Sequence, residues 1–280
     1  MQVLVLTQRP DGVPAGEVIL VHGLEGSSDA GYMRSIAQAL LESGFVVHRM
    51  NLRSCGGTEF LCKTFYHAGL TTDVMALLLE LDRQRRTPVF LVGFSLGGNI
   101  VLKLAGEMGA DARRLLAGVC TLSTPLDLLK CALALHQPAG RPYEWAFLVS
   151  MKRRLRLRHH AMPACFPIDG LERVGSMYDF DDRFTAPGFG FRGADHYYDT
   201  QSARRFLDLI RVPTLVIQAK DDPMIPFTAF DHPAFTLNSH LRLVAVEHGG
   251  HLGFVSRRPP RFWSDGVVTD WIREVAAGAE

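Results

Sequence analysis

One serine of this sequence stands in a pattern that is typical of a catalytic nucleophile. Residues Gly93–Gly97 read Gly-Phe-Ser-Leu-Gly, follow a short apolar run at Val89–Val92 and lead into a good helix sequence that starts at Asn99. On such a tight strand-to-helix turn a serine hydroxyl projects away from the sheet, and the flanking glycines avoid collisions across the turn. The pattern therefore predicts Ser95 as the nucleophile of an acyl-transfer reaction.

A serine hydroxyl is a weak nucleophile at neutral pH, so Ser95 requires a general base and a carboxylate that fixes the tautomer of that base. In proteins with this turn the acid follows a later strand and the histidine follows the last strand. The segment Lys220–Pro223 follows an expected strand that ends near Gln218, and Glu247–Gly253 follows one that ends near Val246. Both segments fall where the mechanism requires them.

Two histidines and two adjacent carboxylates compete for these roles. We predict His251 as the base, because two glycines before it let its loop reach back over the strand ends, and His248 as an anchor of that loop. Neighbouring side chains point in different directions, so Asp221 and Asp222 cannot both meet the histidine. Because Pro223 biases Asp222 toward an extended conformation, we expect Asp222 to be the acid and Asp221 to cap the loop or to be solvated.

Acyl transfer also places negative charge on the carbonyl oxygen, which two backbone N–H groups usually bind. One of these groups should belong to Leu96, directly after the nucleophile. The second should come from the loop after Val18–Val21, where His22 begins a glycine-rich turn, and we expect Leu24 to be its donor. For His22 we favour support of that loop over a catalytic role.

Composition excludes several other classes of protein. The 280 residues include 30 Lys and Arg against 29 Asp and Glu, a formal charge of +1 that argues against a dedicated nucleic-acid binder. Five cysteines without a CxxC pair indicate neither a disulfide framework nor a zinc site, and His159–His160 lacks the partners of a metal ligand pair. We expect no metal, no cofactor, no export or membrane-spanning signal, and a cytoplasmic location.

Two further features bear on the site. Cys55 is expected near it, where bulky thiol reagents would block access. The basic run Lys152–Arg158 could attract anionic lipid head groups or an acidic substrate, or it could be a solvated helix face. We favour the solvated face, because a single short run is weak support for membrane binding.

Short apolar runs alternate with amphipathic stretches, which indicates a parallel sheet with helices on both faces. The expected strands are Val18–Val21, Val46–Asn51, Val89–Val92, Gly118–Leu122, Pro213–Gln218 and Leu241–Val246. The expected helices are Tyr32–Glu42, Thr72–Arg83 and Arg261–Ala276.

The alternation lapses between Thr124 and Arg205, and so long an insertion is typical of a lid over a site. We therefore divide the chain into a core of residues 1–123 and 206–280 and a mostly helical lid of residues 124–205. The lid should form most of an acyl pocket, with aromatic walls that include Trp145, Phe147, Phe180, Phe184 and Phe189.

The sequence resembles the α/β-hydrolase superfamily, within it the branch of YheT-like esterases and their plant and animal relatives. The resemblance spans residues from about 18 to 275 and rests on six segments: His22–Ser27, Asn51–Gly57, Tyr66–Gly69, Gly93–Asn99, Ala219–Pro223 and Glu247–Phe254. It implies a mostly parallel twisted sheet flanked by helices. It also implies Ser95, Asp222 and His251 as the catalytic triad of a carboxylic ester hydrolase.

The N-terminal edge departs from this family. Its members usually have two antiparallel strands before the His-Gly strand, whereas 17 residues precede Val18 here, with room for one strand at Val3–Leu6. We expect a shortened edge, which leaves open a shortened sequence or an edge covered by a partner.

The expected function is hydrolysis of a carboxylic ester with a short- to medium-chain acyl group through an acyl-enzyme intermediate. The substrate would be a small ester or a lipid-like molecule, without nucleic acid. Thioester, amide or phospholipid acyl hydrolysis are alternatives, because the same triad on the same fold supports them. The rival from another class is a catalytically silent hydrolase fold that serves as a binding protein.

Overall fold

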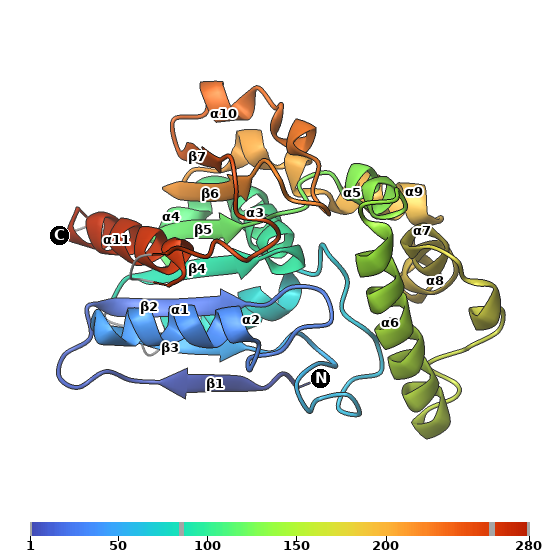
Figure 1. The fold of residues 1–280 in the computed structure, drawn as a ribbon. Helices are drawn as coiled ribbons and strands as arrows, with labels where there is room; N and C mark the ends of the chain where they lie inside the picture. The colour runs from blue at the N-terminus through green and yellow to red at the C-terminus, as the bar shows by residue number, and fades with distance from the viewer. Residues whose placement is uncertain (1, 84–86, 258–260, 279–280) are drawn as a thin grey trace.

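The computed structural model describes residues 2–83, 87–257 and 261–278. They form a sheet of seven strands in the order β1-β3-β2-β4-β5-β6-β7. All neighbouring strands are parallel except β1, which pairs antiparallel with β3 at the edge. Figure 1 shows this sheet with a group of helices beside it.

The strands are β1 (Val5–Gln8), β2 (Gly16–Val21), β3 (Phe45–Met50), β4 (Val89–Phe94), β5 (Gly118–Leu122), β6 (Thr214–Ala219) and β7 (Leu241–Val246). The helices around the sheet are α1 (Gly31–Glu42), α2 (Thr72–Asp82), α3 (Leu96–Met108), α4 (Ala112–Leu115), α10 (Ala234–Leu237) and α11 (Trp263–Ala277). Short 3₁₀ turns lie at Gly109–Asp111, Leu171–Arg173, Ala203–Arg205, Leu207–Leu209 and Phe227–Phe230.

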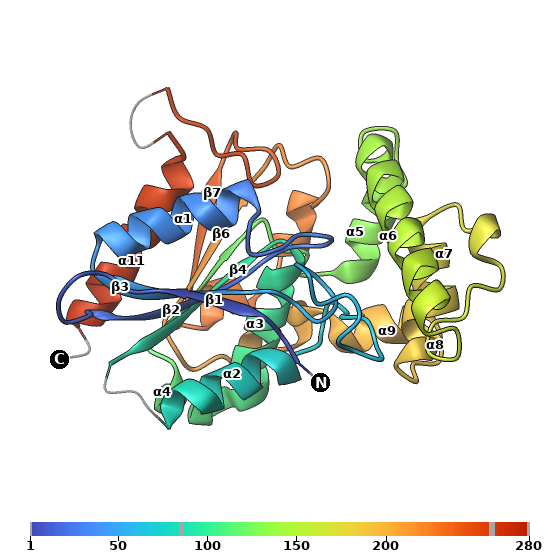
Figure 2. The ribbon, with the colours of Figure 1, turned by 90° about the horizontal axis from the view of Figure 1, so that it is seen from below.

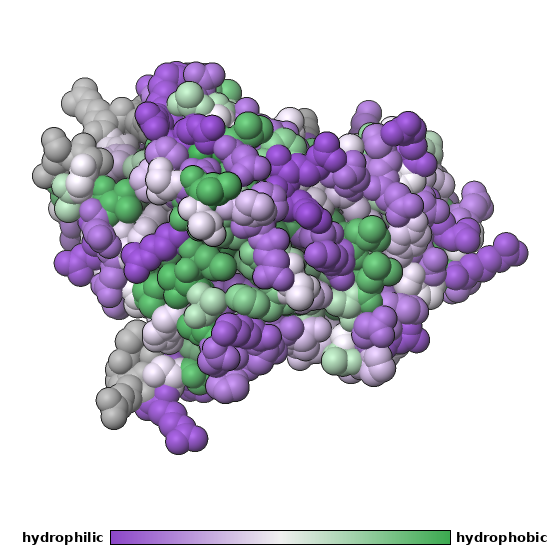
Figure 3. Space-filling model, turned by 90° about the horizontal axis from the view of Figure 1, so that it is seen from above, coloured by the Kyte–Doolittle hydropathy of each residue, from purple (hydrophilic) through white to green (hydrophobic). Residues whose placement is uncertain are grey.

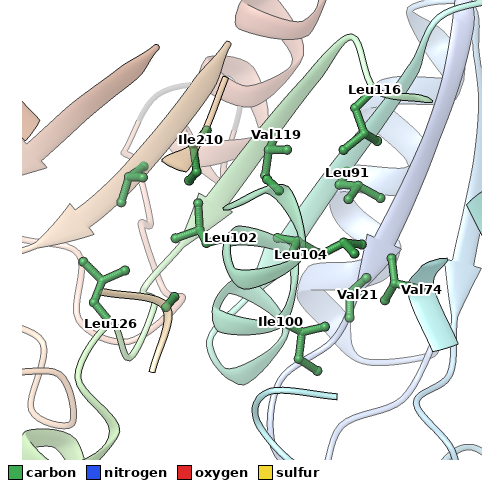
Figure 4. Packing of buried hydrophobic residues seen from close by; sticks show 14 of the residues in the cluster. Val21, Val74, Leu91, Ile100, Leu102, Leu104, Leu116, Val119, Leu126 and Ile210 are labelled. Atoms are coloured by element: carbon green, nitrogen blue, oxygen red, sulfur yellow. The ribbon is translucent and has the colours of Figure 1, made fainter. Parts of the chain in front are cut away.

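Helices cover both faces of the sheet. Figure 2 shows α1 and α11 on one side and α2 and α3 on the other. Met33, Ile36 and Leu40 recur at helical spacing on α1 and are fully buried beneath it. On the opposite face, residues of α3 pack against β4 and β5 in the cluster of Figure 4, which includes Ile100 and Leu104. Each face therefore has an apolar core of its own.

The expected α/β fold is confirmed. Each of the six strands expected in the parallel sheet is present, with bounds that differ by at most two residues. The last helix begins at Trp263 rather than near Arg261. The edge strand lies at Val5–Gln8, two residues beyond the expected Val3–Leu6. It pairs antiparallel with β3, so the described residues place one antiparallel strand at this edge.

The insertion (residues 124–205) contains helices and no strand among its residues, all of which are described. They are α5 (Leu128–Leu135), α6 (Arg141–Ala161), α7 (Met177–Phe180), a π-helix (Asp181–Thr185), α8 (Ala186–Gly188) and α9 (Ala194–Gln201). Figures 1 and 2 both show these helices gathered at one end of the sheet. The division of the chain into core and lid stays a prediction.

The surface is mixed in polarity. On the face viewed in Figure 3, hydrophilic residues predominate and hydrophobic residues gather in patches between them. Within the described ranges, none of the helices combines the length and apolar character needed to span a bilayer.

Candidate active site

Ser95 lies on a strained turn between β4 and α3. Its backbone has φ 51° and ψ −122°, in the positive-φ region that side chains rarely adopt. Glycine is required on both sides: a Cβ at Gly93 would lie 2.6 Å from the carbonyl oxygen of Gly97, and one at Gly97 would lie 2.3 Å from that of Val21. The sequence thus builds a turn that holds the serine at the carboxyl end of β4.

The three side chains of the expected triad form one hydrogen-bonded chain. His251 Nε2 lies 3.0 Å from Ser95 Oγ, and His251 Nδ1 lies 2.8 Å from Asp222 Oδ2. The other oxygen of Asp222, Oδ1, accepts the backbone N–H groups of Met224 and Ile225 at 2.9 and 3.2 Å. These bonds fix the carboxylate and aim one oxygen at the imidazole.

The geometry also selects the tautomer of His251. An ionised carboxylate can only accept, so the Nδ1–H of His251 donates to Asp222. Nε2 then carries a lone pair and accepts the Ser95 hydroxyl. This is the arrangement in which a histidine can remove a proton from a serine.

Asp221 has a different position from Asp222. Its Oδ1 accepts the N–H groups of Gly249 and Gly250 at 2.9 and 2.8 Å, and its Oδ2 lies 3.2 Å from His248 Nδ1. These hydrogen bonds hold the loop that carries His251. The loop-capping role expected of Asp221 and the anchoring role expected of His248 agree with these contacts.

The loop after β2 leaves one N–H group available beside Ser95. The N–H of Gly23 donates to the Tyr32 hydroxyl, and that of Glu25 donates to the Tyr66 hydroxyl. Between them, the N–H of Leu24 finds no acceptor among the described residues. A Cβ at Gly23 would lie 3.0 Å from that of Ser95, a tighter contact than most Cβ atoms make, so glycine favours this close approach of the loop.

Leu96 offers a second N–H group. It is the first residue of α3, and the first N–H groups of a helix have no intrahelical acceptor. The helix dipole adds partial positive charge at the same place. Leu24 and Leu96 are thus both available as donors near Ser95.

His22 supports the Leu24 loop. Its Nδ1–H donates to the carbonyl oxygen of Gly23 at 2.8 Å, and its Nε2 accepts the N–H of Leu52 at 3.1 Å. Both ring nitrogens are therefore used within the core. Burial lowers the pKa of His22 to about 4, so the ring is neutral at pH 7. These contacts agree with the supporting role that we favoured over a catalytic one.

A mainly apolar pocket opens at Ser95 and His251, with about 1020 Å³ of empty space that includes its open mouth. The core contributes residues that follow five strands, β2, β3, β4, β6 and β7. The insertion contributes the rest: Pro125, Leu128, Cys131, Ala132, Leu135, Phe147, Met151, Arg154, Met177, Phe180, Asp181, Thr185, Tyr197 and Tyr198.

The alpha/beta hydrolase fold family matches residues 17–257, most of the chain and all of the site. The chain belongs to this family. This α/β hydrolase is 31% identical over 260 residues to YheT of Escherichia coli (strain K12), which is named as an esterase, and the match covers 91% of this chain and 76% of that protein. The resemblance to the YheT-like branch is thereby confirmed.

A second relative is the monoacylglycerol lipase of Saccharomyces cerevisiae, 27% identical over 88% of this chain and 56% of its own length. The chain thus spans little more than half of that relative. Among solved structures, Est1E from Butyrivibrio proteoclasticus with bound ferulic acid has a TM-score of 0.63 at 15% identity, covering 98% of this chain and 96% of that chain. This likeness shows the fold.

Five aromatic residues were expected to line the pocket of this hydrolase, and for three of them the expectation is wrong. Phe147 and Phe180 do line the pocket. Trp145 is 69% exposed instead, because it lies on the outer face of α6. Phe184 packs in the apolar cluster within the insertion, and the Phe189 ring lies against His67 at 4.5 Å between centroids.

The expectation of a solvated basic run is wrong in part. Arg158 is 1% exposed and donates to the carbonyl oxygen of Ser54, and Arg154 lines the pocket. Both face inward because they are four residues apart on α6. Arg156, on the other face, is solvated and pairs with Glu172.

The thiol of Cys55 is also less accessible than we expected. The residue is fully buried, and burial raises the pKa of its thiol to about 11. Bulky reagents should therefore not reach it in the folded protein.

Among the polar residues of the pocket, sequence reasoning missed roles for Glu25 and Tyr66, and it did not single out Arg154 within the basic run Lys152–Arg158. Tyr66 binds both the N–H and the carboxylate of Glu25, beside the Leu24 loop. A signal was available for the first two, since both lie in segments that carry the family resemblance. Only the packing of α6 reveals Arg154.

Asp181 provides a pH-dependent prediction. Burial raises the pKa of this pocket carboxyl from 3.8 to about 6, although the Tyr198 hydroxyl donates to it at 2.7 Å. The folded state therefore holds the proton more tightly than the unfolded state, and stability falls as pH rises from 3.8 through 6. At about 1.4 kcal/mol per pKa unit, the loss is about 3 kcal/mol.

Asp181→Asn, which stays neutral and can still accept from Tyr198, is expected to remove this loss. Its unfolding free energy in urea should exceed that of the wild type at pH 7.5 and approach it at pH 4. A difference that stays constant with pH would contradict the assignment.

Proposed function

We propose that this α/β hydrolase cleaves carboxylic esters by nucleophilic catalysis, with Ser95, His251 and Asp222 as its triad. The observation that carries the proposal is the hydrogen-bonded chain from Ser95 Oγ through His251 to Asp222 at the mouth of an apolar pocket. The esterase and lipase names of its relatives support the same class of reaction.

Acylation begins when Ser95 Oγ attacks the ester carbonyl carbon and its proton passes to His251 Nε2. Asp222 stabilises the imidazolium that forms. The carbonyl oxygen becomes an oxyanion and accepts hydrogen bonds from the backbone N–H groups of Leu24 and Leu96. When the tetrahedral intermediate collapses, His251 gives the proton to the leaving alkoxide, and an acyl-Ser95 ester remains.

Deacylation repeats these steps with water. His251 removes a proton from the attacking water, the oxyanion forms again at the same two N–H groups, and the proton returns to Ser95 Oγ as the carboxylic acid leaves. Every proton and electron pair is accounted for by these groups, the ester and the attacking water, so the proposed reaction requires no cofactor.

The apolar wall favours a short- to medium-chain acyl group. A panel of nitrophenyl esters of rising acyl length tests this directly: kcat/KM should rise with chain length and then fall when the chain outgrows the pocket. Thioester, amide and phospholipid acyl hydrolysis are alternatives, and matched thioester and amide substrates would rank them.

The insertion should set chain-length preference without performing the chemistry. Phe147→Ala removes a ring of α6 from the pocket wall and so enlarges the pocket. We expect the optimum in the ester panel to shift toward longer acyl chains, while fluorophosphonate labelling of Ser95 changes little. Trp145→Ala, two residues away but exposed, is the matched control and should change neither. Equal loss of hydrolysis and labelling in the Phe147 variant would instead assign this helix a structural role.

The rival is a catalytically silent binding protein with the same fold. The complete triad geometry favours the enzyme. The rival would be favoured if the folded wild-type protein hydrolysed none of the esters and did not react with a fluorophosphonate.

A further inference from the structure

One part of the pocket wall is polar: Glu25, Ser54 and Arg154, here termed the Arg154 pole. It brings together the loop after β2, the loop after β3 and helix α6. Most of the other residues that line the pocket are apolar, so charged groups placed here need partners. The hydrogen bonds of the three residues show which partners are present and which are missing.

The carboxylate of Glu25 is fully engaged. Its Oε1 accepts the Tyr66 hydroxyl at 3.2 Å, and its Oε2 accepts the Ser150 hydroxyl at 2.5 Å and pairs with Arg154 Nε at 3.1 Å. A ligand that approaches the pole therefore does not meet a free acceptor here.

The polar groups of the Arg154 pole that lack a partner are hydrogen-bond donors. Ser54 is fully buried, and its hydroxyl has no hydrogen-bond partner among the described residues. Its backbone has a φ of 68°, a conformation that is uncommon for serine. Arg154 uses Nε for Glu25 and Nη1 for the Ser54 carbonyl and the Cys55 sulfur, and no contact of the described residues uses its Nη2.

A second guanidinium lies behind the first. Arg158 donates to the same Ser54 carbonyl, and its group lies over the rings of Phe65 and Phe166 at 4.5 and 5.2 Å. Its Nε and Nη1 are buried without acceptors among the described residues. Two cations thus converge on one carbonyl oxygen.

The charges around these cations leave the pole short of negative charge. The Cys55 thiol, with its pKa raised to about 11, is neutral at pH 7. Among the described residues, Glu25, which is already engaged, raises the pKa of Arg154, and the partly exposed Glu59 acts in the same direction on Arg158. Unpaired donors beside two cations in an apolar wall favour an anion.

We propose that the Arg154 pole binds an anionic group of the ester substrate, a carboxylate or a phosphate. Arg154 Nη2 and the Ser54 hydroxyl are its donors, and Arg158 supplies the second positive charge. This inference rests on the proposed esterase function and adds a substrate class to it: esters that are apolar near the reacting carbonyl and anionic at one end.

The test compares three esters of equal length that differ at one end: a methyl group, a carboxylate and a phosphate. The readout is the ratio of kcat/KM for each anionic ester to that for the methyl ester. In the wild type, at least one ratio should exceed 1, and the larger ratio identifies carboxylate or phosphate. Arg154→Gln should lower it by about 10- to 100-fold, the range of a charge-assisted hydrogen bond.

Two further variants separate binding from folding. Ser54→Ala removes one donor without changing charge, and it should lower the same ratio by about 3- to 10-fold. Arg156→Gln, on the solvated face of α6, is the matched control and should leave the ratio unchanged.

A wild-type enzyme that prefers the methyl ester over both anionic esters would overturn the proposal. So would equal loss on all three esters in the Arg154 and Ser54 variants. Failure of the proposed function looks different, because the wild type would then cleave none of the three esters.

Discussion

Ser95→Ala is expected to lower kcat for ester hydrolysis by at least about 10³-fold, because the variant lacks the atom that attacks the carbonyl. Among the described residues, the side-chain partner of the Ser95 hydroxyl is His251, so its removal breaks this hydrogen bond. Alanine keeps the Cβ atom, so the positive-φ turn is no more strained than before. The unfolding midpoint should therefore stay close to that of the wild type.

The measurement is kcat for a nitrophenyl ester, with circular dichroism and a urea titration to verify folding. Residual turnover should come from the N–H donors and binding alone. A folded variant that keeps more than a small fraction of wild-type turnover would require another nucleophile.

The second large effect is expected for Asp222→Asn, which should lower kcat by about 10³- to 10⁴-fold. The reason lies in the hydrogen bonds that Asp222 Oδ1, the oxygen that faces away from His251, accepts from the backbone. Met224 and Ile225 donate N–H groups to Oδ1, so an asparagine keeps its carbonyl oxygen there. Its NH₂ group then takes the place of Oδ2 and donates to His251 Nδ1.

That donation forces the wrong tautomer. Nδ1 of His251 must accept, the proton moves to Nε2, and the imidazole can no longer remove the proton of Ser95. The loss should appear chiefly in kcat, with a smaller cost in stability, because the buried Gln218 Nε2 that donates to Oδ2 at 3.2 Å would lose its acceptor.

Asp221→Asn is the matched control one residue away. Its carbonyl oxygen can still accept the N–H groups of Gly249 and Gly250, so the loop that carries His251 should hold. We expect a far smaller loss of kcat than for Asp222→Asn. The reverse ranking would transfer the role of the acid to Asp221.

Much of the site could be predicted because its determinants are local. The turn at Ser95 needs glycines at fixed offsets, and the loops of Asp222 and His251 follow strands that are readable as apolar runs. Parallel strands bring their carboxyl ends to one edge, so loops far apart in sequence could be placed together. The choice of Leu24 followed from a glycine-rich turn of the same kind.

The interior of the insertion could not be predicted in this way. Basic residues repeat along α6 without an apolar stripe, so the sequence alone did not show which face of the helix is buried. Arg158 is buried because the Ser54 carbonyl and two phenylalanine rings, from other parts of the chain, receive it. The prediction of the aromatic pocket residues failed for the same reason. The aromatic content of the insertion does not show which way Phe184 or Phe189 points.

Reaction with a fluorophosphonate, followed by mass spectrometry of the labelled peptide, tests the central claim most directly. The reagent forms a covalent bond only with a serine that a neighbouring base activates. We predict one label per molecule, on Ser95, and its loss in the Asp222→Asn variant. A label on another residue, or a folded wild-type protein that takes up none, would contradict the account.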